Sequence, residues 1–130
     1  MAKDCSAEFK SCGTYDCIVS VGAVAPDTYI DVYRKYYIQH RNAERLFILN
    51  DIRKLTSVLG AEGYRKMGEL ADEYNIGHVY LATVSHDRGR PIHGKMVVAV
   101  LSLFKVGITP RYFNIKEDAV SWLIERYEDT

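Results

Sequence analysis

The chain has 130 residues, close to the commonest size of a single domain, which leaves no room for a second independent one. With 48% hydrophobic and 26% charged residues, the composition predicts a folded globular protein and excludes the disordered and fibrous classes. Basic and acidic residues number 17 each, so no net charge attracts nucleic acid, and we expect no nucleic-acid partner.

The chain offers no segment suited to export or to a membrane span. Its start, MAKDCSAEFKSCG, lacks the apolar stretch of a secretory signal. The longest apolar run, Met96–Phe104, is far shorter than the roughly 20 residues that a membrane-spanning helix needs. We therefore expect a cytoplasmic protein without a membrane span.

The three cysteines, Cys5, Cys12 and Cys17, lie at irregular spacing near the start of the chain. An odd number without a CxxC pair or a nearby histidine predicts neither a disulfide framework nor a zinc site. A redox-active or metal-binding terminus is the alternative to thiols that pack within or beside a strand. We predict no metal and no cofactor.

The first half of the chain predicts a hairpin, a helix and a buried strand, from strand-forming residues, a proline–aspartate start signal and an apolar run without alternation. These elements are a weak strand at Ala7–Ser11 within an edge segment or partly ordered tail at 1–14, a strand at Tyr15–Val24, a helix from Pro26 to about Asn42, and a strand at Arg45–Ile52.

The second half predicts helices and strands in alternation, from helical apolar stripes and β-branched runs. These elements are a helix at Ala61–Tyr74, strands at His78–Val84 and Ile108–Phe113, a helix at Met96–Val106, and a final helix capped by Asn114 with an apolar face of Ala119, Trp122, Leu123 and Ile124. This alternation implies right-handed crossovers. We therefore predict an α/β domain over residues 1–130, with a mainly parallel sheet of four to five strands, an antiparallel edge strand and about four flanking helices.

Four tyrosines recur at helical spacing in the first predicted helix: Tyr29, Tyr33, Tyr36 and Tyr37. Such a stripe could stack on bases, but aromatic residues at this spacing are more often core. We predict a core stripe.

Two segments, Arg45–Tyr74 and Ile108–Leu123, resemble the SpoIIAA-like branch of the STAS domains. RLFILNDIRKLTSVLGAEGYRKMGELADEY is similar to the second-strand unit of that family, in which a hydrophobic strand ends in an acid before a loop and a helix. ITPRYFNIKEDAVSWL is similar to its last strand, acidic turn and tryptophan-containing helix. With HVYLATVS between them, they cover roughly Tyr15 to Glu125.

The resemblance implies a regulatory domain without enzymatic activity, which binds a protein partner in signalling such as antagonism of an anti-sigma factor. In the regulatory members of that family, a partner kinase phosphorylates a serine at the start of the helix after the second-strand unit, and Ser57 and Thr56 lie closest to that place. The double-serine-glycine run of the switch proteins is absent here. Capping the helix or shaping its loop is the other interpretation of these hydroxyls.

A basic loop follows the strand at His78–Val84, at the edge where open parallel sheets bind ligands. Its candidate residues are His86, Arg88, Arg90, His93 and Lys95. Beside a helix start they could bind a small anion or an acidic partner, or they form an ordinary solvated loop. Asp51 and Arg53 end the neighbouring strand and form either the second edge of this cleft or a routine ion pair.

Apolar residues on more than one face of the helix at Met96–Val106 predict a contact surface, made of Val97, Val100, Leu101 and Phe104. We expect a second copy of the chain to cover it in a homodimer. The neighbouring final helix and a lipid-like ligand are the alternatives, and the lipid-carrying CRAL-TRIO proteins share a similar architecture.

We rank three functions: a non-enzymatic interaction domain first, a domain that binds a small anion or lipid second, and a hydrolase-type enzyme last. The enzyme would use His86, His93 or Asp51 as acid or base. No spacing between these residues matches a known catalytic motif. We therefore predict a protein that is not an enzyme.

Overall fold

The structure is a computed structural model, which describes residues 6–57, 61–86 and 107–129. Its strands are β1 (Ser6–Ser11), β2 (Asp16–Gly22), β3 (Arg45–Leu55), β4 (His78–Val84) and β5 (Gly107–Phe113), and its helices are α1 (Pro26–Gln39), α2 (Ala61–Glu73) and α4 (Lys116–Glu128). The strands form one sheet in the order β1-β2-β3-β4-β5. β1 pairs antiparallel with β2, and the other neighbours are parallel. The prediction of a mixed α/β sheet with an antiparallel edge strand is confirmed.

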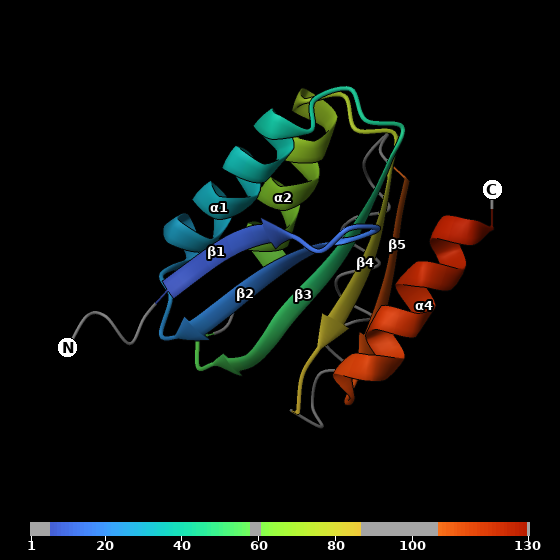
Figure 1. Ribbon diagram of the computed structural model, residues 1–130. Helices are drawn as coiled ribbons and strands as arrows, with labels where there is room; N and C mark the ends of the chain where they lie inside the picture. Colours follow the sequence, from blue (N-terminus) through green and yellow to red (C-terminus); the bar gives the residue numbers. More distant parts are fainter. Residues whose placement is uncertain (1–5, 58–60, 87–106, 130) are drawn as a thin grey trace.

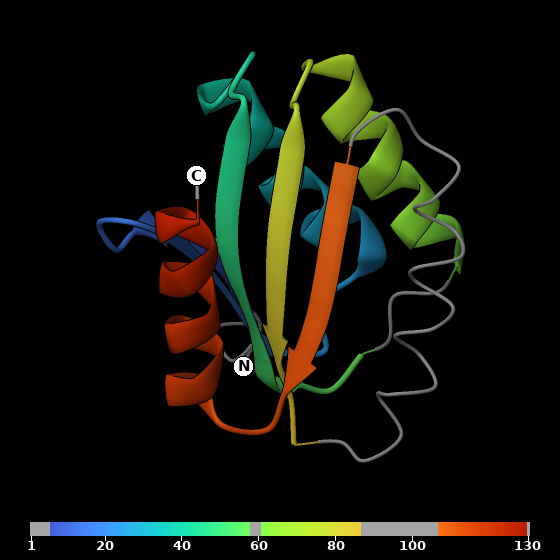
Figure 2. The ribbon, with the colours of Figure 1, turned by 90° about the vertical axis from the view of Figure 1, so that its right-hand side faces the viewer.

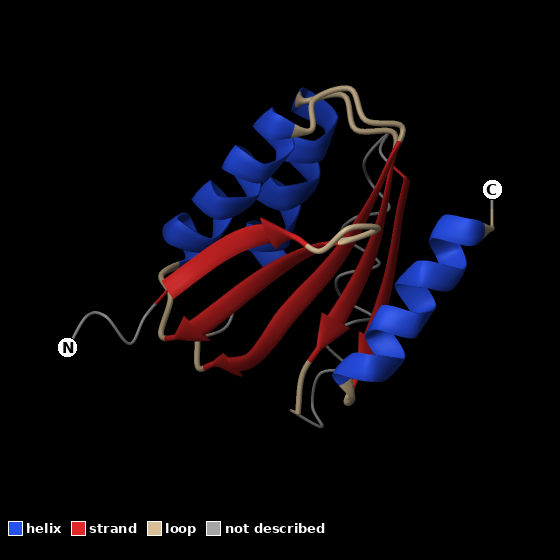
Figure 3. Cartoon of the chain, viewed as in Figure 1, coloured by secondary structure: helices blue, strands red, loops and turns tan. Residues whose placement is uncertain are grey.

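The helices lie on both faces of the sheet. α1 and α2 cover one face, and α4 crosses the other (Figure 1). In Figure 2, α4 lies on the near side of the sheet, beside β3 in this view, and the two other helices lie on its far side. Because β2 to β5 run parallel, their carboxyl ends point to the same end of the sheet (Figure 3). Loops far apart in sequence therefore meet at that end.

The core under α1 is built by the predicted tyrosine stripe, which is confirmed. Tyr29, Tyr33, Tyr36 and Tyr37 are all buried, and Tyr33 and Tyr36 have no exposed surface. The rings follow one another at centroid distances such as 5.4 Å between Tyr29 and Tyr33, within the range of favourable aromatic pairs. Their faces are occupied by the core, so these rings present no platform for bases.

The core under α4 is a second aromatic cluster. Phe47 of β3 stacks on Tyr80 of β4 at 5.1 Å, and Trp122 of α4 meets Tyr80 edge-on at 6.3 Å. Ala119 and Leu123 are also buried there, as predicted. Ile124 is 37% exposed, so its assignment to the buried face was wrong: it lies one residue beyond the stripe, rotated toward solvent.

Several element ends differ from the predictions: β2 ends at Gly22 instead of Val24, and α1 ends at Gln39 instead of near Asn42. β3 continues to Leu55, because pairing with β2 extends to Gly22, whose carbonyl accepts the N–H of Thr56 at 2.9 Å. The predicted cap of the last helix is wrong: Ile115, in an extended conformation, stands at the cap position, and no side chain caps the helix. Glu117 and Asp118 lie in the first turn, where their charges suit the helix dipole.

Three helices are described, where about four were predicted. The helix predicted at Met96–Val106 lies outside the described residues. Within residues 6–57, 61–86 and 107–129, no helix is long and apolar enough to cross a membrane.

Candidate functional site at the carboxyl ends of the strands

Of the described segments that follow the parallel strands at one end of the sheet, three carry or contact predicted site residues. They are residues 23–25 after β2, residues 56–57 after β3, and residues 85–86 after β4. Open parallel sheets commonly bind ligands and partners at this end, because the loops there vary without disturbing the sheet. We call these three segments the carboxyl edge.

Ser57 joins two loops of the carboxyl edge. Its hydroxyl donates a hydrogen bond of 2.7 Å to the backbone carbonyl of Val24, 33 residues earlier in the chain. The bond is partly buried, while the neighbouring side chain of Thr56 is exposed. Of the two interpretations of Ser57 as a structural residue, loop shaping fits this contact, since the hydroxyl bonds to a carbonyl of the β2–α1 loop.

Asp51 and Arg53 brace an irregularity in β3. The β2–β3 register shifts between Val19 and Val21, so that Ile52 and Arg53 together lie opposite one residue of β2. Asp51 accepts hydrogen bonds from the Arg53 side chain at 2.9 and 2.7 Å and from its backbone N–H at 3.2 Å. Such bulges bend a strand near its end and are frequent beside functional sites.

This environment keeps the Asp51 carboxylate charged. Burial acts to raise its pKa, but the hydrogen bonds from Arg53, together with the charges of Arg53 and Lys116, outweigh that effect and hold the pKa below its usual value. Both oxygens are engaged by Arg53. A carboxylate held in this way is a poor proton acceptor near neutral pH, so its geometry suits a structural role.

A buried polar network lies on the opposite face of the same strands. The Tyr29 hydroxyl donates to Oδ1 of Asn50 at 2.9 Å, and Nδ2 of Asn50 donates to the Thr83 hydroxyl at 3.4 Å. All three side chains are buried. The hydroxyl of Ser20, fully buried on β2, has no hydrogen-bond partner among the described residues. The network ties α1 to β3 and β4 directly beneath the carboxyl edge.

The sequence analysis did not single out this network. The available signal was Asn50, a polar residue inside the apolar run RLFILNDI, where seven consecutive residues from Leu46 to Ile52 are buried. A buried side-chain amide needs hydrogen-bond partners, so a buried asparagine predicts a polar network around it. The identity of Tyr29 and Thr83 as those partners depends on the fold.

The predicted site residues divide into two groups. Asp51, Arg53, Thr56, Ser57 and His86 belong to or adjoin the carboxyl edge, and His86 is exposed. The rest of the basic loop and the whole predicted oligomer or ligand surface lie outside the described residues: Arg88, Arg90, His93, Lys95, Val97, Val100, Leu101 and Phe104. In the described part of the chain, no three His, Cys, Asp or Glu side chains come together as metal ligands would.

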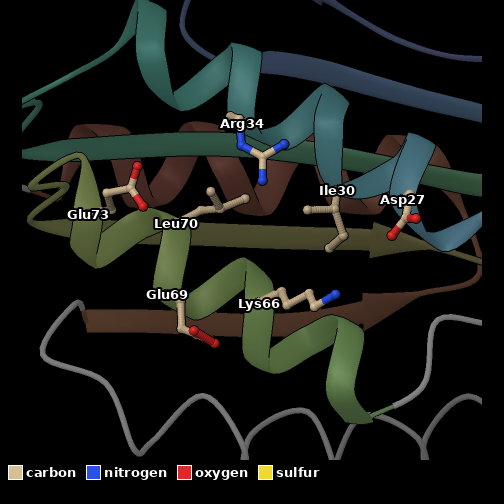
Figure 4. A pocket seen from close by; sticks show the side chains of 7 residues that line it. All are labelled: Asp27, Ile30, Arg34, Lys66, Glu69, Leu70 and Glu73. Carbon is tan, nitrogen blue, oxygen red and sulfur yellow. The ribbon is translucent and has the colours of Figure 1, made fainter.

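A groove of about 440 Å³ lies elsewhere, between α1 and α2 (Figure 4). Ile30 and Leu70 provide its apolar part, and its charged lining residues are Asp27, Arg34, Lys66, Glu69 and Glu73. These charges are mixed in sign, and several are already paired: Arg34 lies 3.4 Å from Asp31, and Glu69 lies 3.2 Å from Arg65. The groove therefore shows no preference for a ligand of one charge.

Comparison of the chain with protein-family models, with curated proteins and with solved structures gave no match in any of the three. The fold defines the class: an α/β domain with a five-stranded mixed sheet.

Proposed function

We propose that this protein is a non-enzymatic regulatory domain of the STAS type, which binds a protein partner through the carboxyl edge. The observation that carries the proposal is the hydrogen bond from Ser57 to the carbonyl of Val24, which joins the β2–α1 and β3–α2 loops. Ser57 is also one of the two residues, with Thr56, that the resemblance places nearest the regulatory serine. One hydroxyl thus controls the shape of the surface that a partner would contact.

Modification of this hydroxyl changes the edge through simple electrostatics. A phosphoryl group on Ser57 removes the donor and places negative charge beside a carbonyl oxygen, so the bond to Val24 is replaced by repulsion. The sheet and α1 beneath these loops should keep their structure, because the Asp51–Arg53 pair stabilises the end of β3 and Asn50 bonds to Tyr29 of α1. The effect therefore concentrates in the loops.

Site-specific crosslinking tests the binding surface. A photoreactive residue replaces Thr56, which is exposed at the carboxyl edge, or Thr14, which is exposed in the β1–β2 turn at the other end of the sheet. In the cell that makes the protein, we expect position 56 to yield one defined crosslinked partner that position 14 does not. Ser57→Asp should abolish that product. Equal labelling from both positions, or no product from position 56, would contradict the proposal.

Phosphorylation is tested separately by mass. The purified protein is incubated with extract of the same cells and ATP, and we expect the mass of one added phosphate, lost in Ser57→Ala and retained in Thr56→Ala. An unchanged mass, or a phosphate on Thr56, would contradict Ser57 as the regulatory site. The proposed partner surface is tested independently by the crosslinking experiment.

A further inference from the structure

β1 is an edge strand of the described sheet. It pairs with β2, and the sheet order places no other described strand beside it. The residues of β1 and β2 pair one to one from Ser6 opposite Val21 to Ser11 opposite Asp16, so no bulge interrupts the pairing. The N–H of Cys12 points into the hairpin, where it donates to Tyr15 at 2.9 Å. Because backbone groups alternate along a strand, those of Ala7, Phe9 and Ser11 point away from β2.

The side chains of β1 alternate between the two faces of the sheet. Glu8 and Lys10 are exposed on the face that carries α4, as Glu8 lies opposite Val19, which packs on the α4 side. Phe9 points to the other face, where its ring meets Tyr36 of α1 edge-on at 5.6 Å. The strand therefore presents one acid and one base, two residues apart, on a single face.

We infer that β1 pairs antiparallel with β1 of a second copy of this chain, with Phe9 opposite Phe9 of the second copy. This proposal is independent of the partner proposed for the carboxyl edge. In this register the outward backbone groups of Phe9 bond to their counterparts, and those of Ala7 bond to Ser11 of the second copy. The two sheets then continue into one another across a two-fold axis.

Charge complementarity selects this register. With Phe9 on the axis, Glu8 lies opposite Lys10 of the second copy and Lys10 lies opposite its Glu8, at side-chain separations of about 5 Å between Cβ atoms. A shift of the axis to Glu8 or to Lys10 places like charges opposite one another. A shift of one strand by one residue places outward backbone groups opposite inward ones. It also places side chains of opposite faces of the sheet across from one another.

The two edges of the sheet differ in how they are protected. β5 has Pro110 in its middle. Proline has no N–H to donate and is typical of edge strands that do not pair with a further strand. β1 contains no proline, and its exposed charges are of opposite sign. A strand with an acid and a base two residues apart on one face complements a second copy of itself in an antiparallel pair.

Charge exchange tests the pairing. Native mass spectrometry and sedimentation should show a wild-type dimer, and Glu8→Lys or Lys10→Glu should each raise the dimer dissociation constant about tenfold or more, because two attractive pairs become repulsive. The double variant that exchanges both charges restores both pairs and should dimerise like the wild type. An equimolar mixture of the two single variants should form a heterodimer for the same reason. Glu44→Lys, the same charge change at an exposed site near the start of β3, should leave the dissociation constant unchanged.

Ala7→Pro tests the backbone ladder. The N–H that this variant removes points away from β2, so the fold should persist by circular dichroism while the dimer is lost. A monomeric wild type, or single charge variants that dimerise like the wild type, would overturn the inference. Failure of the mixed variants to associate would do the same, and none of these results bears on crosslinking at Thr56.

Discussion

The hydroxyl of Tyr29 in α1 donates a hydrogen bond of 2.9 Å to Oδ1 of Asn50 in β3, 21 residues further along the chain. The same amide donates to Thr83 of β4, so a single side chain links a helix to two strands. All three residues are buried, and none can exchange its partner for water without a cost. This contact fixes the first turns of α1 above the sheet, next to the loop that Ser57 holds.

Tyr29→Phe should lower the free energy of unfolding by about 1–3 kcal/mol, because the buried Oδ1 of Asn50 loses its donor while packing is retained. Urea unfolding followed by circular dichroism measures the change. The matched control is Tyr127→Phe in α4, whose tyrosine is 45% exposed and should change stability by less than about 0.5 kcal/mol. Equal effects of the two variants would show that the hydrogen bond does not contribute.

Ser57→Ala should lower the free energy of unfolding by about 1 kcal/mol and accelerate amide exchange in residues 23–25, because the tie to Val24 is lost. Ser57→Asp should do more, since its carboxylate also places negative charge beside the Val24 carbonyl oxygen. Thr56→Ala is the control, as that side chain is exposed. Exchange rates in residues 23–25 that do not differ among the three variants would contradict the coupling of the two loops.

Asp51→Asn should reduce stability at neutral pH by about 1–2 kcal/mol, because the charged hydrogen bonds to Arg53 are weakened and the pair is partly exposed to solvent. The pKa of Asp51 is depressed in the folded protein. Its contribution is therefore present above the unfolded pKa of about 3.9 and is lost as the pH falls through the lower folded value. The difference between wild type and Asp51→Asn should shrink below about pH 4.

The control for this pH dependence is Glu125→Gln on α4, where the acid is largely exposed. Urea unfolding from neutral pH into the acid range should show little difference between this variant and the wild type at any pH. A gap between wild type and Asp51→Asn that stays constant down to the lowest pH would refute a depressed pKa.

Gly77→Ala should destabilise the protein by about 1–3 kcal/mol, because a Cβ atom there would lie 2.5 Å from the backbone carbonyl oxygen of Glu44. Gly13→Ala is an informative comparison: nothing lies within 4 Å of its Cβ position, but its φ of +93° strains a side chain. Its cost should come from backbone strain alone, about 1 kcal/mol. Thermal unfolding of both variants checks the prediction, and an unaffected Gly77→Ala would show that β3 and β4 can separate at this point.

The predicted end of α2 shows how far local patterns reach. The segment Asn75 to Gly77 was predicted to stop the helix, and Asn75 does adopt a left-handed conformation with φ of +57°. Gly77 has a separate role that sequence patterns do not report, the close approach to Glu44 on a neighbouring segment. The stop was predictable because it is local, and the packing was not because it joins two distant segments.

The candidate site divides in the same way. Asp51, Arg53 and Ser57 could be identified from their place after an apolar strand, but the sequence left open whether they cap, pair or line a cleft. The structure pairs Asp51 with Arg53 and attaches Ser57 to Val24. The basic loop after His86 and the apolar surface from Val97 to Phe104 stay predictions, since these residues lie outside the described part of the chain.

The sequence by itself determined the hairpin, the tyrosine core of α1, the buried character of β3 and the alternation that makes a largely parallel sheet. Those properties follow from periodicity, because burial of one face repeats every two or 3.6 residues along the chain. Only the tertiary structure decided that Asn50 bonds to Tyr29, that Ser57 bonds to Val24, and that β1 has only β2 as a neighbour among the described strands. Those relationships join residues that the order of strands brings together, and hydrogen bonds form between groups that are close in space, whatever their separation in sequence.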